Sequence, residues 1–329
     1  MKKYIVLLGI FMFLITGCGD KNKNNVIKEL EKKINNASSY HLTGEMKIVN
    51  NEDKNIYEVD VSFEKDDKYR VSLKNKTNNH EQIILKNDDG VYVLTPTLNK
   101  SFKFQSDWPY NNSQAYLLQN IINDIKSDKN AKFTNNKDEY IFEVNATYSN
   151  NKELKKQRIT LDHNFNIKKV EVLDDNNQVI IQMDFDDVDL KANFKNDHFT
   201  LKSNKVEKKE LKQTSNTIND IIYPMYIPDN TKLTSQERVK LEEGERVILT
   251  FTGDKEFTLI EETAAVEDEN VIIPVSGEIE MISDVFGYLT DNSVSWISGG
   301  IDYYLSSQTM DKTELLSVAS SINMLPVSK

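Results

Sequence analysis

The chain has 329 residues with 52 acidic and 41 basic side chains, so it carries a formal net charge of −11 at pH 7. This acidity argues against a nucleic-acid-binding protein, because phosphate backbones attract basic surfaces. The single cysteine rules out an internal disulfide, a CxxC redox pair and a cysteine-rich metal site. The length exceeds one typical domain and is enough for two hydrophobic cores.

The first twenty residues have the pattern of a secretory signal. Lys2 and Lys3 precede an apolar run over residues 4–15, which is too short to span a bilayer comfortably. The run ends in the sequence ITGC, which closes on Cys18 and resembles a bacterial lipobox. This resemblance implies a signal peptide over residues 1–17, diacylglycerol and acyl chains on Cys18, and a tether over residues 18–25. The alternative is an ordinary secretory signal with a chance cysteine.

A lipid on Cys18 would anchor the protein to the extracytoplasmic face of the cell membrane, because two or more acyl chains hold a protein there stably. No later segment has 18 consecutive apolar residues, so we expect no other membrane crossing. We also expect no cofactor besides the covalent acyl chains.

The tether leads into a predicted amphipathic helix of about three turns. Val26, Ile27, Leu30 and Ile34 recur at helical spacing, and Asn25 is a candidate N-cap. Such a helix covers one face of a sheet, or it plugs a cavity or docks a partner.

From His41 the apolar period changes to two, which predicts short strands with one solvent-facing side. The sequence NDDG at 87–90 predicts a tight hairpin turn, because glycine adopts positive φ readily. A second helix is predicted near residues 116–125. The alternation slips at Asp186 and Asp187, which a β-bulge would explain. For residues 26–202 we predict one domain of about ten strands, a curved sheet with helices against its concave side.

A polar stretch rich in lysine and glutamate predicts a linker over residues 203–220. Residues 221–329 then predict a smaller α+β domain. Hairpins are expected around Gly253 and Gly299, and further strands at 271–275, 279–282 and 285–289. A capping box of Asp311 and Glu314 begins the last helix.

The sequence contains no catalytic motif of the GxSxG, HExxH or GxxxxGK[ST] kind. Ser62 and Lys65 match SxxK, but on a strand their side chains point to opposite faces. The acidic run Asp184, Asp186, Asp187 and Asp189 either binds calcium through its oxygens or forms a solvated strand face, and it lacks the EF-hand glycine and glutamate. We therefore predict a protein that is not an enzyme and has no catalytic or metal site.

Five aromatic residues are candidates for lining a ligand cavity in the first domain. They could enclose a lipid, or they could form an ordinary core between the sheet and its helices. These residues are Phe102, Phe104, Trp108, Phe142 and Phe185.

The sequences KYR at 68–70, QIIL at 82–85 and DGVYVLTP at 89–96 resemble the central hairpins of the LolA/LolB lipoprotein-carrier superfamily. Downstream, ITLD at 159–162 and FTL at 199–201 fit the same order of elements. The resemblance covers roughly residues 26–202. It implies an α+β fold with an incomplete antiparallel β-barrel of about 10–11 strands, closed by helices over an apolar concavity. It also places the arginine that is important in the carriers on Arg70, a candidate ligand residue, with Val71 where an aromatic usually follows.

Residues 221–329 resemble a domain of sporulation lipoproteins of the YdcC type, on the sequences YIP at 226–228, GD at 253–254 and ELL at 314–316. Clostridial germination lipoproteins of the GerS type share the lipobox and the LolA-like part. These resemblances imply a Gram-positive binding or scaffold protein of sporulation or germination, at the cell, forespore or spore membrane. They imply an envelope partner such as a cortex-modifying amidase. The alternative is a lipid or lipoprotein carrier or receptor that uses the apolar cavity.

Overall fold

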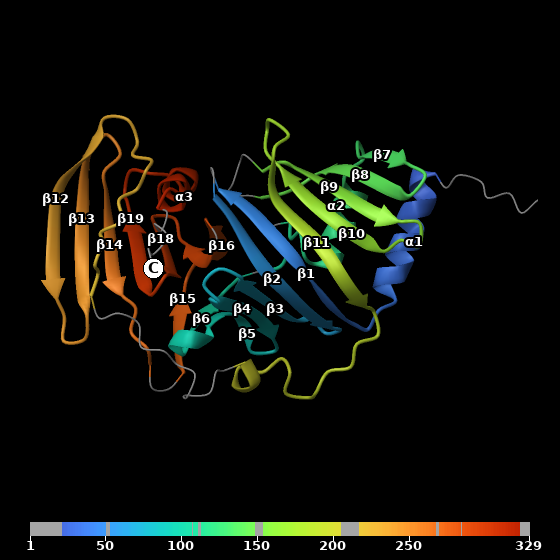
Figure 1. Cartoon of the computed structure of the whole chain (residues 1–329), viewed down its shortest axis with the longest axis horizontal. Helices are drawn as coiled ribbons and strands as arrows, with labels where there is room; N and C mark the ends of the chain where they lie inside the picture. Colours follow the sequence, from blue (N-terminus) through green and yellow to red (C-terminus); the bar gives the residue numbers. More distant parts are fainter. Residues whose placement is uncertain are drawn as a thin grey trace, which may run out of the picture.

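Two β-sheets and three α-helices make up the part of the protein that the computed structural model describes, namely residues 22–50, 53–106, 108–110, 113–148, 154–204, 217–267, 270–283 and 285–322. The predicted signal peptide and Cys18 lie outside these residues. Among the described residues, no helix is long and apolar enough to cross a membrane. Figure 1 shows the larger sheet with its helices on one side and the smaller sheet next to it.

The larger sheet has twelve strands. They are β1 (Ser39–Asn50), β2 (Asp53–Glu64), β3 (Lys68–Asn75), β4 (Glu81–Asn87), β5 (Gly90–Thr95), β6 (Lys100–Phe104), β7 (Lys132–Asn135), β8 (Glu139–Asn145), β9 (Lys156–Asp162), β10 (Ile167–Leu173), β11 (Val179–Asp189) and β15 (Val271–Val275). Short 3-10 turns cover Pro96–Leu98 and Lys202–Asn204.

The order of these strands is β15-β6-β5-β4-β3-β2-β1-β11-β10-β9-β8-β7, and β15 and β7 form the two ends of the sheet. Neighbouring strands are antiparallel except β15 and β6, which run parallel. The prediction of a mainly antiparallel β fold with few helices is confirmed, but the sheet is open and does not form the predicted incomplete barrel. The strand count is higher than predicted, because the short β7 was missed and because β15 comes from the C-terminal part of the chain.

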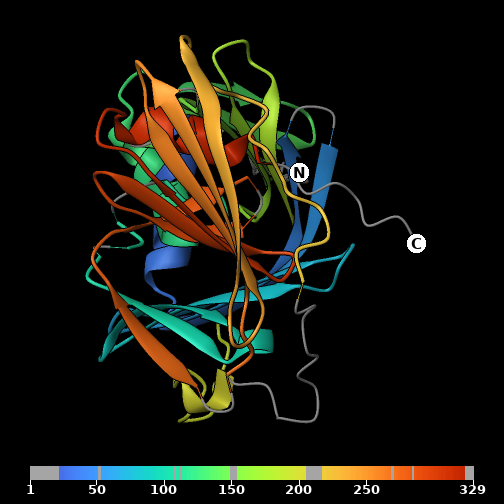
Figure 2. The ribbon, with the colours of Figure 1, turned by 90° about the vertical axis from the view of Figure 1, so that its left-hand side faces the viewer.

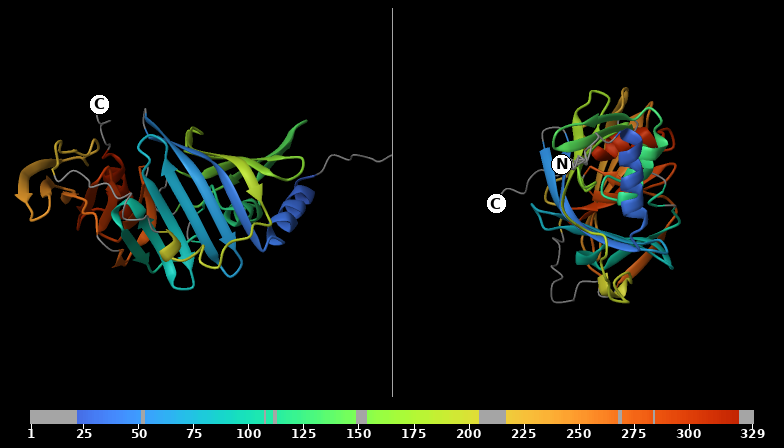
Figure 3. Two further views of the ribbon diagram at one scale, coloured as in Figure 1. Left: turned by 60° about the horizontal axis from the view of Figure 1, so that its bottom comes forward. Right: turned by 90° about the vertical axis from the view of Figure 1, so that its right-hand side faces the viewer.

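The first helix, α1 (Lys23–Asn35), lies in the hollow of the curved sheet, as the right-hand view of Figure 3 shows. Its buried residues Val26, Leu30 and Ile34 are the ones that the helical spacing singled out. The predicted N-cap was wrong, since the helix begins three residues earlier. Asn22 is the cap, and its side chain accepts a hydrogen bond of 3.0 Å from the backbone N–H of Asn25.

The second helix, α2 (Leu118–Ser127), packs next to α1 and fills the middle of the concave side. Its isoleucines belong to one large core together with the inward-facing residues of the sheet. The hydroxyl of Tyr40 on β1 donates a hydrogen bond of 2.8 Å to Gln119, which fixes the start of the helix over that strand. The structure thus favours the interpretation of the helices as covers of the sheet.

The predicted β-bulge is confirmed between β1 and β11. Gly44 pairs with Phe185 and Thr43 pairs with Asp187, so Asp186 is the extra residue. A Cβ at position 44 would lie 2.2 Å from the carbonyl oxygen of residue 184, which explains the glycine at this close approach.

The smaller sheet has seven strands in the order β12-β13-β14-β19-β18-β17-β16. They are β12 (Thr231–Lys240), β13 (Glu245–Gly253), β14 (Phe257–Thr263), β16 (Glu278–Ile282), β17 (Val285–Leu289), β18 (Ser293–Ser298) and β19 (Ile301–Ser306). One helix, α3 (Lys312–Ser320), packs on this sheet over a core of its own. Figure 2 looks onto this sheet in front of the larger one. We call the larger sheet with α1 and α2 the first lobe, and the smaller sheet with α3 the second lobe.

Most local predictions for the second lobe are confirmed. The β13–β14 hairpin turns at Gly253, and the β18–β19 hairpin turns at Gly299 and Gly300, both with positive φ. Asp311 and Glu314 form the capping box of α3. The sequence analysis missed β12, because its ten residues are mostly polar and exposed and show no apolar alternation.

A buried carboxyl group lies in the core of the second lobe. Glu261 on β14 exposes none of its surface, and its Oε1 accepts a hydrogen bond of 3.0 Å from the backbone N–H of Ile222. Its Oε2 has no hydrogen-bond partner among the described residues. Burial disfavours the charged form and raises the pKa of Glu261 to about 7.

Because this pKa is higher in the folded state than in the unfolded chain, ionisation of Glu261 opposes folding. The stability of wild type is expected to decrease as the pH rises from about 4.5 to about 7. Glu261→Gln keeps the acceptor for Ile222 but does not ionise. The free energy of unfolding of this variant, relative to that of wild type, should therefore be about 2 kcal/mol higher at pH 8 than at pH 5. Urea unfolding at both pH values measures this. Glu262→Gln is the matched control, and an equal pH dependence of wild type and Glu261→Gln would contradict the expectation.

The two lobes are joined by the pairing of β15 with β6 and by buried hydrogen bonds. β15 follows the second lobe's first strands in sequence, yet it pairs with β6 of the first lobe. Gln82 on β4 makes two buried hydrogen bonds to Phe286 on β17: its Nε2 donates to the carbonyl oxygen at 2.9 Å, and its Oε1 accepts from the N–H at 2.6 Å. The side-chain amide of Gln82 thus satisfies both backbone groups of Phe286, as a neighbouring strand would.

Candidate functional site

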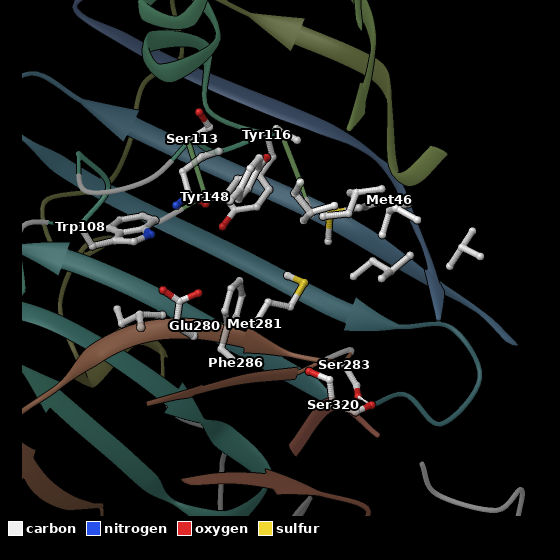
Figure 4. Close-up of a pocket in the computed structure, with 18 residues that line it drawn as sticks. Met46, Trp108, Ser113, Tyr116, Tyr148, Glu280, Met281, Ser283, Phe286 and Ser320 are labelled. Atoms are coloured by element: carbon white, nitrogen blue, oxygen red, sulfur yellow. Dashed lines mark hydrogen bonds between the residues drawn. The ribbon is translucent and has the colours of Figure 1, made fainter. Parts of the chain in front are cut away.

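A cavity of about 330 Å³ lies where the first lobe meets the second. Figure 4 shows Tyr116 and Tyr148 on one wall and Glu280, Met281 and Phe286 on the facing wall. The lining side chains are mostly apolar and come from both lobes. They are Met46, Ile48, Val49, Trp108, Ser113, Gln114, Ala115, Tyr116, Tyr148, Leu154, Ile180, Ile181, Ile279, Glu280, Met281, Ser283, Phe286 and Ser320.

The wall from the first lobe is built by strand alternation and by one loop. Met46 and Ile48 on β1 point to the concave side, because residues two apart share a face of a strand. Trp108 precedes α2 and is only 1% exposed, with its ring edge-on to Tyr69 at 5.7 Å between ring centres. These side chains give the cavity an apolar floor.

The facing wall is the hairpin of β16 and β17, which is apolar on both faces. Ile279, Met281 and Phe286 face the first lobe, while Val285 and Leu289 belong to the core of the second lobe. A strand that is buried on both faces has a nearly continuous apolar sequence, as residues 285–289 do. That run was the available signal that this hairpin lies between two cores.

One end of the cavity is polar. The Tyr116 side chain is 3% exposed, and its hydroxyl has no partner among the described residues. The Tyr148 hydroxyl accepts a hydrogen bond of 3.3 Å from Gln157, and burial raises the pKa of both tyrosines. Burial also raises the pKa of the nearby Asp124 carboxyl to about 6. The cavity can therefore hold an apolar chain that carries a hydrogen-bonding group at one end.

Of the five aromatic residues proposed for a cavity, the structure places Trp108 in its lining. Phe102 and Phe104 lie at the lobe interface, with ring centres 5.8 and 6.4 Å from that of Tyr288. The other two belong to the core of the first lobe: Phe142, which packs on Phe133 at 4.9 Å, and Phe185. Sequence reasoning missed the rest of the lining, which includes residues of the first lobe as well as the wall that the second lobe supplies.

Arg70 lies on the opposite, convex face of the larger sheet. It alternates on β3 with Tyr69 and Val71, whose side chains belong to the concave core. Its Nε donates a hydrogen bond of 2.6 Å to Asn204, and its Nη1 forms an ion pair of 3.0 Å with Asp60. Arg70 thus holds the start of the predicted linker against the sheet, inside a polar groove of about 1050 Å³.

The same groove contains one serine–histidine pair. Ser62 Oγ and His198 Nε2 are 2.9 Å apart, but Ser62 exposes none of its surface. Burial lowers the pKa of His198. A nucleophilic serine has to reach its substrate, so the pair fits a structural hydrogen bond better than catalysis.

The acidic run on β11 does not converge on one point. Asp184 forms an ion pair of 3.2 Å with Lys47, while the neighbouring bulge displaces Asp186 and Asp187. The described residues contain no group of three or more His, Cys, Asp or Glu side chains arranged to hold a metal ion.

Comparison with known proteins gives one close relative. The chain is 34% identical over 327 residues to the sporulation protein YdcC of Bacillus subtilis strain 168, and the match covers 98% of this chain and 97% of the relative. No family model matches the sequence.

Solved structures show weaker similarity. A MucA/MucB complex of Pseudomonas aeruginosa has a TM-score of 0.33 at 13% identity, covering 90% of this chain and 96% of that one. The LolA superfamily protein NE2245 of Nitrosomonas europaea has a TM-score of 0.32 at 11% identity, over 56% and 99%. The CwlD amidase of Clostridioides difficile in complex with the GerS lipoprotein has a TM-score of 0.24 at 18% identity, over 53% and 97%. These scores are too low to support an argument about function.

Proposed function

The chain belongs to the family of the sporulation protein YdcC, and from this membership we propose that it acts in spore formation or germination as an extracytoplasmic, non-enzymatic binding protein. The observation that carries the proposal is the 34% identity over 98% of the chain, which includes both lobes. The missing catalytic motifs and the inaccessible Ser62 support a binding role over an enzymatic one.

We propose further that lipid on Cys18 anchors the protein to the outer face of a membrane, the cell membrane or that of the forespore or spore. The ITGC sequence behind an apolar signal supports this. The partner that we propose is an envelope protein, with a cortex-modifying amidase as the first candidate to test, on the resemblance of the sequence to germination lipoproteins.

Deletion of the gene in the source bacterium tests the proposed role. We expect fewer heat-resistant spores or slower germination, with vegetative growth unchanged. A plasmid copy of the wild-type gene should restore both measurements. A deletion strain that sporulates and germinates like wild type would contradict the proposal.

The interlobe cavity favours a second candidate function, a lipid or lipoprotein carrier or receptor. Its mostly apolar walls and the buried Tyr116 hydroxyl suit a hydrocarbon chain with a polar head. A protein fixed to one membrane cannot shuttle, so an anchored receptor fits this candidate better than a soluble carrier.

Native mass spectrometry of the protein purified from membranes tests this candidate. We expect a stoichiometric lipid in addition to the anchor. Ala115→Leu, which fills the cavity, should lower the occupancy at least tenfold. Ala192→Leu makes the same change in the groove on the convex face and should keep the lipid. Wild-type protein without any second lipid would exclude this function.

A further inference from the structure

β12 forms an open edge of the second lobe. It is the end strand of the smaller sheet and pairs only with β13 among the described residues. Eight of its ten residues are exposed, and no described segment besides β13 makes a backbone hydrogen bond to residues 232–240. A long edge with free N–H and C=O groups is a template on which another strand can pair.

Exposed apolar side chains gather around this edge. The described residues include ten large apolar side chains that are exposed, and six of them lie between residues 223 and 239. Met225 is 77% exposed, Tyr226 48% and Tyr223 45%. Tyrosine and methionine are enriched at protein interfaces, where their large side chains bury much area.

The segment that carries these side chains is held in place. The Tyr223 hydroxyl donates a hydrogen bond of 2.6 Å to Gln236 on β12. The backbone N–H groups of Met225 and Tyr226 donate to the carbonyl and hydroxyl oxygens of Ser321, at 3.2 and 3.0 Å. The apolar side chains are thus presented next to the edge by a fixed backbone, which lowers the entropic cost of binding.

The charges on β12 select among the possible occupants. A second copy that paired antiparallel about Gln236 would bring Lys232 opposite Lys240 at both ends, and like charges opposite each other destabilise a strand pair. Neither lysine forms an ion pair with another described residue. A strand with carboxylates at these two places would pair with both.

A membrane surface is the poorer occupant of this edge. The predicted anchor precedes α1, which lies at one end of the long axis of the molecule, and β12 lies at the other end (Figure 1). The anchored protein can therefore present β12 away from the membrane that holds Cys18.

We propose that β12, together with Tyr223, Met225 and Tyr226, is the docking surface for an extended acidic segment of a partner protein, which adds as a further strand to the smaller sheet. This inference rests on the proposed function, since it names the surface through which the binding protein would engage its partner.

The probe is a pair of ten-residue peptides that alternate threonine and valine, one with glutamates at both ends and one with lysines. Fluorescence anisotropy measures their binding to the full lipidated chain in detergent, and amide hydrogen exchange locates it. We expect the glutamate peptide to bind at least tenfold more tightly and to protect residues 231–240. Lys232→Glu combined with Lys240→Glu should reverse the preference, whereas Lys28→Glu combined with Lys191→Glu, the same charge change on the first lobe, should not.

Equal binding of the two peptides, protection elsewhere, or protection of β12 by dimerisation of the chain alone would overturn the proposal. A cellular comparison separates this failure from that of the proposed function. If the Lys232→Glu/Lys240→Glu strain behaves like wild type while the deletion strain does not, the docking surface is wrong and the sporulation role is kept. If the deletion strain itself behaves like wild type, the proposed function fails.

Discussion

Gln82→Leu is expected to weaken the junction of the two lobes strongly, because it removes two buried hydrogen bonds between them. The substitution keeps the approximate volume of the side chain. It removes the hydrogen-bond partners of the Phe286 N–H and carbonyl groups, which stay buried. Each buried polar group left without a partner costs about 1–3 kcal/mol. We therefore expect a loss of about 3 kcal/mol in the free energy of unfolding.

Urea unfolding measures the loss, and amide hydrogen exchange shows where it arises. The Phe286 amide and the rest of β17 should exchange faster in Gln82→Leu, while the β1–β2 pair should change less. Gln178→Leu makes the same chemical change at an exposed turn and should have little effect. If Gln82→Leu unfolded at the same urea concentration as wild type with unchanged exchange of Phe286, the role assigned to Gln82 would be wrong.

Cys18→Ala is expected to abolish lipid attachment completely, because Cys18 carries the only thiol of the chain. Cells grown with an alkyne-tagged fatty acid should label the wild-type protein and leave the variant unlabelled. The variant should also keep its signal peptide and run as a longer precursor, since cleavage at a lipobox follows lipidation.

Lys21→Ala serves as the matched control for this experiment. It changes a residue of the tether close to Cys18 and should leave both labelling and cleavage intact. Label retained by Cys18→Ala would show that the fatty acid is attached elsewhere and would remove the anchor from the account.

Local patterns predicted the first lobe well where one face of a strand is buried and the other is wet. The slip of alternation at Asp186 and the NDDG turn at 87–90 both appear where expected. Such features depend on neighbouring residues, and the residues themselves carry the signal.

The sequence was less informative where distant segments meet. Residues 271–275 were recognised as a strand, but pattern alone cannot show that this strand joins β6, 171 residues earlier in the chain. β12 carries no apolar alternation because one of its edges and most of its side chains face solvent.

The position of the candidate cavity differs from the prediction. An apolar concavity of the first domain closed by helices was expected, whereas this cavity lies between the lobes, with Trp108 in its wall. The wall formed by Ile279, Met281 and Phe286 depends on how the two lobes pack, which no local period encodes. Arg70, placed by family resemblance among the ligand residues, lies on the other face of β3 and holds Asn204.

The central claim, an anchored binding protein of sporulation, is tested most directly by counting heat-resistant spores in one deletion strain. Three derivatives of this strain are compared: one without the gene, one with the wild-type gene and one with the Cys18→Ala gene, the last two expressed to equal levels. We predict that the wild-type chain restores the count and that Cys18→Ala does not. Equal counts in all three strains, matching the parent, would contradict the account.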